Sequence, residues 1–333
     1  MTQPNAAQKL AVLPAGVWYP EGIATNPGTG DVYVGTFDFG TADRPADNKL
    51  LRLNRIGKVI AEHDYAGQPL LGLTFDADHG YLYIANMGAS KIQRIPANFT
   101  DQTAVVDVAT IPGIGAPADR EVANPDGSAD TVKFGSNSFP APNGMAFDPG
   151  GNLYVSDSFQ GAIFRIDDPA NCAGACTPEL VAHDPLLATA GHPPFGANGL
   201  AFNADQSALF IANTGDDRVL KLDLHSKTLS VFAESVNGAD GLAFDDRGRL
   251  WVAANQADEL VALNENGRVV ASLGEFQGIN RDGSPDGLLF PASLSIQGRH
   301  ILVTNLALPL TGAVGDEPEE DATSFTVSRL QIP

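Results

Sequence analysis

The chain has 333 residues, 43% of them hydrophobic, and its 40 Asp and Glu against 20 Lys and Arg give a formal net charge of −20 at pH 7. This acidity argues against binding to nucleic acid or to anionic membrane surfaces, because both require a surplus of basic side chains. The sequence shows no apolar run long enough to span a bilayer. We therefore expect the partner to be a small-molecule substrate, and the oligomeric state is left open.

A short sequence motif recurs along the chain and predicts the first strand of six repeats. In five copies a variable residue is followed by glycine and then mostly by apolar residues, and the sixth copy is degraded. The copies lie at residues 21–24, 71–75, 143–147, 198–202, 240–244 and 293–296.

Further strands follow each copy. Second strands are predicted at residues 32–34, 82–84, 153–155, 209–211, 250–252 and 301–303, and third strands at 50–53, 92–95, 163–166, 219–222 and 260–263. A weaker fourth strand, such as 59–61 or 269–271, closes the unit. Four antiparallel strands in a unit of about forty to fifty residues are typical of a propeller blade.

The sequence thus predicts an all-β fold, a six-bladed β-propeller with four antiparallel strands per blade. We expect residues 1–333 to form a single domain, because each blade buries its faces only against its neighbours. The last unit lacks a fourth strand at the C-terminus, and residues 10–13 are expected to supply it from the N-terminus.

The variable residue before each glycine is the candidate functional position. The first strand of a blade lines the central channel, where a Cβ in place of the glycine hydrogen would clash. The residues before the glycines should therefore form a ring at one mouth of the channel. Its members are Glu21, Leu71, Asn143, Asn198, Asp240 and Ser293.

Four members of this ring, Glu21, Asn143, Asn198 and Asp240, carry carboxylate or amide oxygens. Hard oxygen donors without His or Cys favour Ca²⁺, which takes about six to eight ligands and so keeps positions for water or substrate. Another divalent ion, such as Zn²⁺, Mn²⁺ or Mg²⁺, is left open. The alternative is that Asn-Gly and Asp-Gly serve only as turn formers, which does not explain Glu21.

With these segments the chain resembles the senescence marker protein/gluconolactonase superfamily of calcium-dependent six-bladed propellers. Its relatives include drug-responsive lactonases, paraoxonase and diisopropyl fluorophosphatase. The resemblance extends from about residue 20 to residue 330 and rests on residues 20–22, 142–148, 197–202 and 239–245. It implies that Glu21, Asn143, Asn198 and Asp240 bind the catalytic calcium. The arginine-rich sugar contacts of the family's sugar-lactone hydrolases have no counterpart that we identify in this sequence.

The loops around the ring are rich in aromatic residues, which predicts an apolar or aromatic substrate. Polar residues at the ends of the second strands are expected to face the same mouth, where they orient substrate, support a ligand or cap the strand. They are Asn86, Asp157, Ser158, Asn213, Thr214, Asn255 and Asn305. The candidate substrate contacts are Leu71, Phe39, Phe139, Asp157, Phe159, Asn213, His192 and Ser293.

We therefore expect a metal-dependent hydrolase that acts on a lactone or an ester with an apolar body. Asp240 and Glu21 are the candidate catalytic residues, with Asp240 either activating water or attacking the substrate directly. An organophosphate or phosphofluoridate hydrolase that uses the same ion is an alternative. A non-catalytic propeller that binds a partner on its open face is another.

The compartment depends on the two cysteines, Cys172 and Cys176. A local disulfide between them favours a periplasmic or secreted protein, and free thiols favour a cytoplasmic one.

Overall fold

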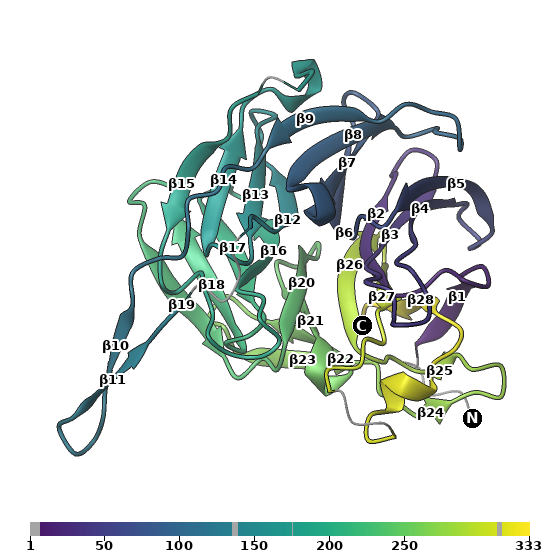
Figure 1. Ribbon diagram of the computed structural model, residues 1–333. Coiled ribbons are helices and arrows are strands. Elements are labelled where there is room, and N and C mark those ends of the chain that lie inside the picture. Colours follow the sequence, from purple (N-terminus) through teal and green to yellow (C-terminus); the bar gives the residue numbers. More distant parts are fainter. Residues whose placement is uncertain (1–6, 135–138, 175, 312–314) are drawn as a thin grey trace.

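A computed structural model describes residues 7–134, 139–174, 176–311 and 315–333. Six four-stranded antiparallel sheets follow one another around a central axis, so the predicted six-bladed β-propeller is confirmed (Figure 1). In the described residues the helices are four short 3-10 turns, η1 (Met87–Ala89), η2 (Pro169–Asn171), η3 (Asn255–Ala257) and η4 (Pro318–Asp321). None of the described helices has the length and apolar character needed to cross a membrane.

Five blades are formed by consecutive strands, counted from the axis outward. Blade 1 contains β2 (Pro20–Thr25), β3 (Val32–Thr36), β4 (Asn48–Leu53) and β5 (Val59–Ala66). Blade 2 contains β6 (Leu70–Asp76), β7 (Tyr81–Asn86), β8 (Lys91–Pro96) and β9 (Val106–Thr110). Blade 3 contains β12 (Pro142–Phe147), β13 (Leu153–Asp157), β14 (Ala162–Ile166) and β15 (Glu179–His183). Blade 4 contains β16 (Ala197–Phe202), β17 (Ala208–Asn213), β18 (Arg218–Asp223) and β19 (Leu229–Glu234). Blade 5 contains β20 (Ala239–Phe244), β21 (Leu250–Ala254), β22 (Glu259–Leu263) and β23 (Val269–Leu273).

Blade 6 joins the two ends of the chain. It contains β26 (Pro291–Gln297), β27 (His300–Asn305), β28 (Thr326–Gln331) and, as its outer strand, β1 (Gln8–Val12). β1 pairs antiparallel with β28 from Gln8 opposite Arg329 to Val12 opposite Thr326. The predicted closure by an N-terminal strand is confirmed, with the strand starting two residues earlier than expected.

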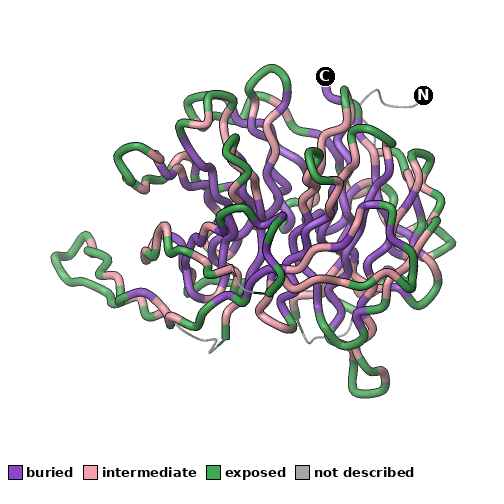
Figure 2. The backbone as a smooth tube through the Cα atoms, turned by 90° about the horizontal axis from the view of Figure 1, so that it is seen from above, coloured by how far each residue is buried: buried purple, intermediate pink, exposed green. Residues whose placement is uncertain are grey.

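The core lies between the blades. The second strands are buried along almost their whole length, as in β17 and β21, because both faces of each sheet pack against neighbouring sheets. The outer strands, such as β19 and β23, are largely exposed. Figure 2 shows this gradient, with buried segments inside and exposed turns at the periphery.

The glycines of the repeated motif allow adjacent blades to come into close contact. A Cβ on Gly22 would overlap the main-chain oxygen of Leu71 in the next blade. The same overlap recurs from Gly144 to the oxygen of Asn198 and from Gly199 to that of Asp240. Only glycine allows the first strands to approach this closely, which is the reason inferred from the sequence.

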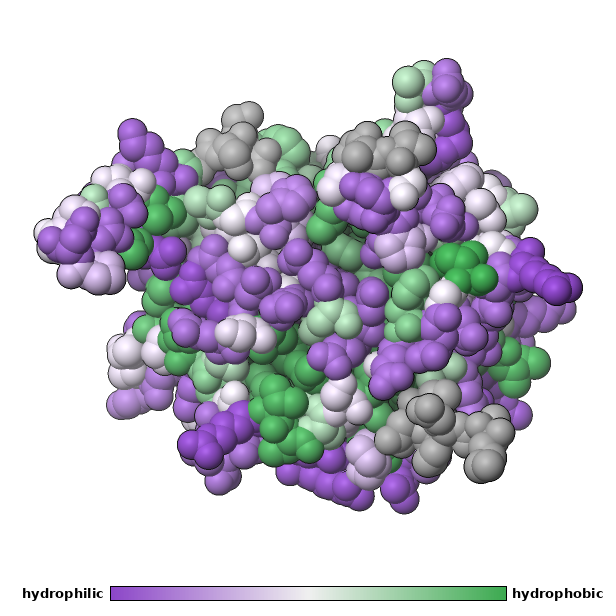
Figure 3. Space-filling view, turned by 90° about the horizontal axis from the view of Figure 1, so that it is seen from below, coloured by the Kyte–Doolittle hydropathy of each residue, from purple (hydrophilic) through white to green (hydrophobic). Residues whose placement is uncertain are grey.

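Two small hairpins lie outside the blades. The first, β10 (Arg120–Ala123) with β11 (Ala129–Val132), lies between blades 2 and 3 in sequence and projects from the ring beside β19 of blade 4 (Figure 1). Seen from below in Figure 3, it is the mostly hydrophilic projection at the left. The second hairpin is β24 (Gly278–Ile279) with β25 (Pro285–Asp286). Near blade 3, Cys172 and Cys176 form a disulfide with their Cα atoms 5.6 Å apart.

Candidate metal centre

An irregularity in the first strand of each blade directs the ring residues toward the axis. In blade 3, Pro142 pairs with Asp157 but Met145 pairs with Val155, so Asn143 and Gly144 together lie opposite one residue. The same shift occurs in the first strand of every other blade. Such a bulge re-aims a side chain that regular alternation would point into the sheet.

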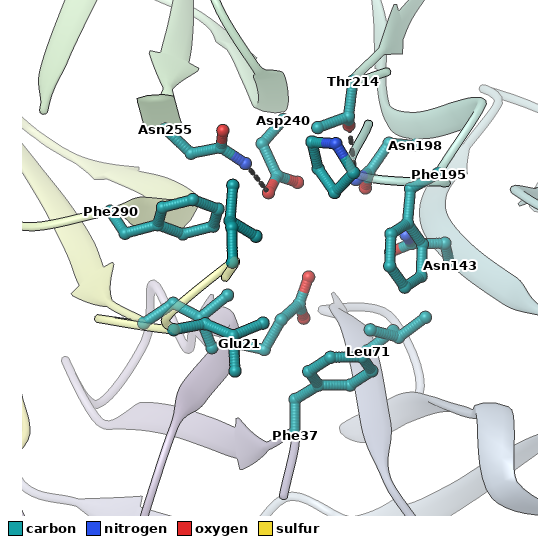
Figure 4. A pocket seen from close by; sticks show the side chains of 14 residues that line it. Glu21, Phe37, Leu71, Asn143, Phe195, Asn198, Thr214, Asp240, Asn255 and Phe290 are labelled. Atoms are coloured by element: carbon teal, nitrogen blue, oxygen red, sulfur yellow. Dashed lines mark hydrogen bonds between the residues drawn. The ribbon is translucent and has the colours of Figure 1, made fainter. Parts of the chain in front are cut away.

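The bulges bring five of the six predicted ring residues to one pocket (Figure 4). Its lining comprises Glu21, Phe37, Leu71, Asn143, Pro193, Phe195, Asn198, Thr214, Asp240, Asn255, Phe290, Leu306, Leu308 and Leu310. The cavity volume is about 30 Å³, which is room for an ion or about one water molecule.

The four ring residues with carboxylate or amide oxygens are almost fully buried. Glu21, Asn143, Asn198 and Asp240 are between 2% and 5% exposed. Figure 4 shows the carboxylates of Glu21 and Asp240 pointing into the same space from opposite sides. Burial of a charged group is costly unless it is paired, so these carboxyl groups either take up a proton or are balanced by a positive charge.

Both amide side chains of the ring are held by hydroxyl groups. Asn143 Nδ2 donates to Ser158 Oγ at 3.0 Å, and Asn198 Nδ2 donates to Thr214 Oγ1 at 2.9 Å. Asn255 Nδ2 donates to Asp240 Oδ2 at 3.1 Å. One oxygen of each carboxyl group, Glu21 Oε2 and Asp240 Oδ1, is buried without a hydrogen-bond partner.

The pKa values of both carboxyl groups are raised. Burial is the main cause for Glu21, and the nearby Asp240 carboxylate adds to it. Burial also raises the pKa of Asp240 to about 7, although the amides of Asn255 and Asn198 lower it in part. Two buried carboxyls facing one cavity oppose each other's ionisation, and a cation between them removes this conflict.

The donor set fits a hard divalent cation. In the described part of the chain, no group of three or more His, Cys, Asp or Glu side chains is placed to hold a metal. The ring has two carboxylates, and its other candidate ligands are amide oxygens, which suit Ca²⁺ better than Zn²⁺. The unpartnered oxygens of Glu21 and Asp240 are the buried polar atoms that such an ion would satisfy.

The rest of the pocket is apolar. Phe37 follows β3, Phe195 precedes β16, Phe290 precedes β26, and leucines 306, 308 and 310 follow β27. The residues that line the pocket in the described structure include no Lys, Arg or His. A hydrophobic wall with a few polar groups at its base is typical of a site for a small apolar ligand.

Three of the predicted aromatic contacts lie beside the pocket rather than in its lining. Phe159 contacts Phe195, with ring centroids 5.3 Å apart, and Phe139 contacts Phe159 at the same distance. Phe39 packs edge-on against Phe37 at 4.7 Å. Phe39 and Phe139 are 61% and 45% exposed, so a series of rings connects the pocket wall to the surface.

Four predicted polar contacts are likewise absent from the pocket lining. Asp157 accepts hydrogen bonds from the backbone N–H groups of Phe159 and Gln160, and Asn213 Nδ2 donates to the carbonyls of Leu186 and Ala188. Both side chains therefore fix loops. His192 and Ser293 also lie outside the lining residues.

Three other polar side chains hydrogen-bond the candidate metal ligands Asn143, Asn198 and Asp240. They are Ser158, Thr214 and Asn255, which directly follow β13, β17 and β21. The strand-end pattern in the sequence includes both Asp157 and Ser158. Alternation along a strand sends neighbours to opposite faces, and the sequence alone does not say which neighbour points to the axis.

Comparison with known proteins agrees with this architecture. Residues 188–274, which include Asn198 and Asp240, match the model of a family described as SMP-30/Gluconolactonase/LRE-like region. No curated protein matches the sequence. The match supports the resemblance indicated by the sequence over residues 188–274.

Several solved structures share the fold at low sequence identity. A luciferin-regenerating enzyme has a TM-score of 0.64 at 13% identity, covering 95% of this chain and 92% of its own. Regucalcin from Agrobacterium tumefaciens, described as a calcium-binding protein, has a TM-score of 0.60 at 14% identity, covering 97% and 96%. A gluconolactonase from Xanthomonas campestris has a TM-score of 0.58 at 13% identity, covering 99% and 95%. Identities this low show the fold alone.

Proposed function

We propose that this protein is a calcium-dependent hydrolase of a lactone or ester with an apolar body. The proposal is carried by one observation: two buried carboxylates, each with an unpartnered oxygen, face one ion-sized cavity at the base of an apolar pocket. The similarity to a family that includes gluconolactonases supports a lactonase-type activity.

Glu21, Asn143, Asn198 and Asp240 would hold the ion. A bound Ca²⁺ would supply a Lewis acid that polarises a carbonyl oxygen and offsets the negative charge that develops there. The apolar wall around Phe37, Phe195 and Phe290 would contact the body of the substrate once these side chains move apart, because the present free volume of about 30 Å³ holds only an ion or a water molecule. The absence of basic side chains from the described lining disfavours strongly anionic substrates.

Asp240 is the residue we assign to the chemical step. As a general base, it accepts a proton from water while the water oxygen attacks the carbonyl carbon. The carbon–oxygen bond of the ester then breaks, and the proton passes to the departing alkoxide. As a nucleophile, the Asp240 carboxylate attacks the carbonyl carbon, the ester carbon–oxygen bond breaks, and the departing alkoxide takes a proton from water. The hydroxide left by that water then hydrolyses the mixed anhydride, which releases the product carboxylic acid and restores the Asp240 carboxylate.

A single-turnover reaction in ¹⁸O-labelled water separates these two routes. Incorporation of the label into the Asp240 carboxylate supports direct attack. Label found only in the product supports the general-base route.

The proposed function is tested by metal binding and by substrate turnover together. Chelated protein is titrated with Ca²⁺ in a calorimeter, and a panel of aliphatic lactones, aryl esters and phosphotriesters is then assayed with and without the ion. We expect one high-affinity site per chain and calcium-dependent turnover of an apolar lactone or ester. Turnover of phosphotriesters alone would assign the organophosphate alternative, and binding without any turnover would assign a non-catalytic propeller. Activity that survives chelation would remove the metal from the mechanism.

A further inference from the structure

Two hydroxyl groups link the amide ligands to the main chain of the next blade. Ser158 Oγ accepts from Asn143 Nδ2 and donates to the carbonyl of Ala197 at 2.7 Å. Thr214 Oγ1 accepts from Asn198 Nδ2 and donates to the carbonyl of Ala239 at 2.7 Å. Ala197 and Ala239 directly precede the next two ring residues.

Counting protons fixes the orientation of each amide. A hydroxyl has one proton, and here that proton goes to a main-chain carbonyl, which has no proton to give. Each hydroxyl must therefore accept one proton from the asparagine Nδ2, and Oδ1 is the amide atom left to bind an ion. In Asn198 the amide also hydrogen-bonds the neighbouring Asp240 carboxyl. In a flipped amide, Oδ1 and the main-chain carbonyl would compete for the single hydroxyl proton, and Nδ2 would point its N–H groups at the ion. Both arrangements are unfavourable in a buried site.

We propose that Ser158 and Thr214 are positioning residues that make the ring selective for a cation by locking Asn143 and Asn198 with their oxygens inward. This inference rests on the proposed function, because it concerns ligands of the same ion. The links are directional: blade 3 is tied to blade 4 and blade 4 to blade 5, and Asn255 then orients Asp240. Three ligands are thereby aligned by one arc of hydrogen bonds across three blades.

A neighbouring serine shows what a purely structural hydroxyl looks like. Ser156 lies on β13, two residues before Ser158, and is fully buried. Its Oγ donates its one proton to the carbonyl of Asn198 at 2.6 Å, and the carbonyl of Gly144 lies farther away at 3.3 Å. It joins the same two blades but bonds no ligand side chain. Ser156→Ala should therefore cost stability without changing metal affinity, which makes it the matched control.

The test compares Ca²⁺ affinity across four variants of the full chain. Thr214→Val keeps the shape but removes the hydroxyl, Thr214→Ser restores it, Ser158→Ala removes the other hydroxyl, and Ser156→Ala is the control. Chelated proteins are titrated with Ca²⁺ by calorimetry, and their melting temperatures are measured without the ion. Loss of an outer partner of a metal ligand typically weakens binding about 10- to 100-fold.

We expect Thr214→Val and Ser158→Ala to weaken Ca²⁺ binding by about that factor, with near-normal affinity in Thr214→Ser and Ser156→Ala. If both hydroxyl-deleted variants bind Ca²⁺ as tightly as the unaltered protein, the inference is wrong. An equal loss of affinity in Ser156→Ala would show a general effect of destabilisation and would overturn it as well. If the unaltered protein does not bind Ca²⁺, the proposed function fails instead. Because the two variants act in different blades, misfolding of one leaves the other decisive.

Discussion

At the scale of single residues, the candidate metal centre depends on one variable position in a repeated sequence motif. Glu21, Asn143, Asn198 and Asp240 are separated by up to 219 residues in sequence, but the propeller places them around one small cavity. Leu71 occupies the corresponding position in blade 2 and leaves that side of the ring apolar. In five of the six blades the repeat thus keeps its glycine and changes the chemistry at the position before it.

Asp240→Asn should abolish turnover and preserve the fold. The amide cannot accept a proton from water or attack a carbonyl as a carboxylate does, and general-base catalysis contributes about 10²- to 10⁴-fold. We expect a loss of at least about 10²-fold in kcat on a substrate identified by the panel, with an unchanged circular dichroism spectrum. Asp205→Asn, in an exposed turn, is the control. Retained turnover in Asp240→Asn would remove this residue from the chemical step.

Glu319 should make stability depend on pH independently of the ring. Burial raises the pKa of this side chain to about 6, and the carboxylates of Asp258 and Glu317 add to the effect. Because the folded state favours the protonated form, its contribution is present below the ordinary value of 4.5 and is lost as pH rises through about 6.

Glu319→Gln should therefore raise the melting temperature at pH 8 and have little effect at pH 4. Thermal unfolding at both pH values measures this difference, with the exposed Glu265→Gln as control. The same shift in melting temperature at both pH values would contradict the explanation.

At the scale of elements, the first strand of each blade carries both the ring residue and the contact to the next blade. The glycine allows close approach, and the bulge turns the preceding side chain toward the axis. The hydroxyl groups after the second strands then join the ring to the neighbouring sheet. Packing and site geometry are therefore set by the same few residues of each blade.

Gly144→Ala should be strongly destabilising. The added Cβ would overlap the main-chain oxygen of Asn198, and a main-chain atom in the centre of the ring cannot move aside cheaply. Overpacking usually costs about 1–3 kcal/mol, and we expect about 3 kcal/mol or more at this position. Urea denaturation measures the change, with Gly113→Ala as the control because its added Cβ meets no atom within 4 Å. A denaturation midpoint equal to that of Gly113→Ala would show that the blades are less tightly packed than described.

At the scale of the whole molecule, blade 6 closes the ring by joining both ends of the chain. β1 covers the edge of β28, and the neighbouring Leu13 is buried with a backbone N–H bond to the carbonyl of Phe325. Without β1, the sheet of blade 6 would end in an unpaired strand. An open edge of this kind weakens a ring and invites association with other chains.

Deletion of residues 1–13 should therefore destabilise the entire propeller. Removing the buried Ala11 and Leu13 and the β1–β28 pairing should cost about 3 kcal/mol or more. Urea denaturation with sedimentation analysis should show a lower midpoint and self-association. A truncated chain with an unchanged midpoint would mean that the other three strands of blade 6 hold the ring closed.

The blade count, the strand order within each blade and the closing strand could be predicted from the sequence alone, as could five of the six residues expected around the cavity, all except Ser293. These features could be predicted because they repeat: aligning the six copies of one motif places Asn143, Asn198 and Asp240 at equivalent positions. Only the three-dimensional structure shows which of two adjacent polar residues hydrogen-bonds a candidate metal ligand. Ser158 rather than Asp157 and Thr214 rather than Asn213 reach the ring, because the direction of a side chain at a strand end depends on pairing with the neighbouring strand and on the adjoining blade. Those contacts form only when the ring closes, so no local pattern in the sequence could encode them.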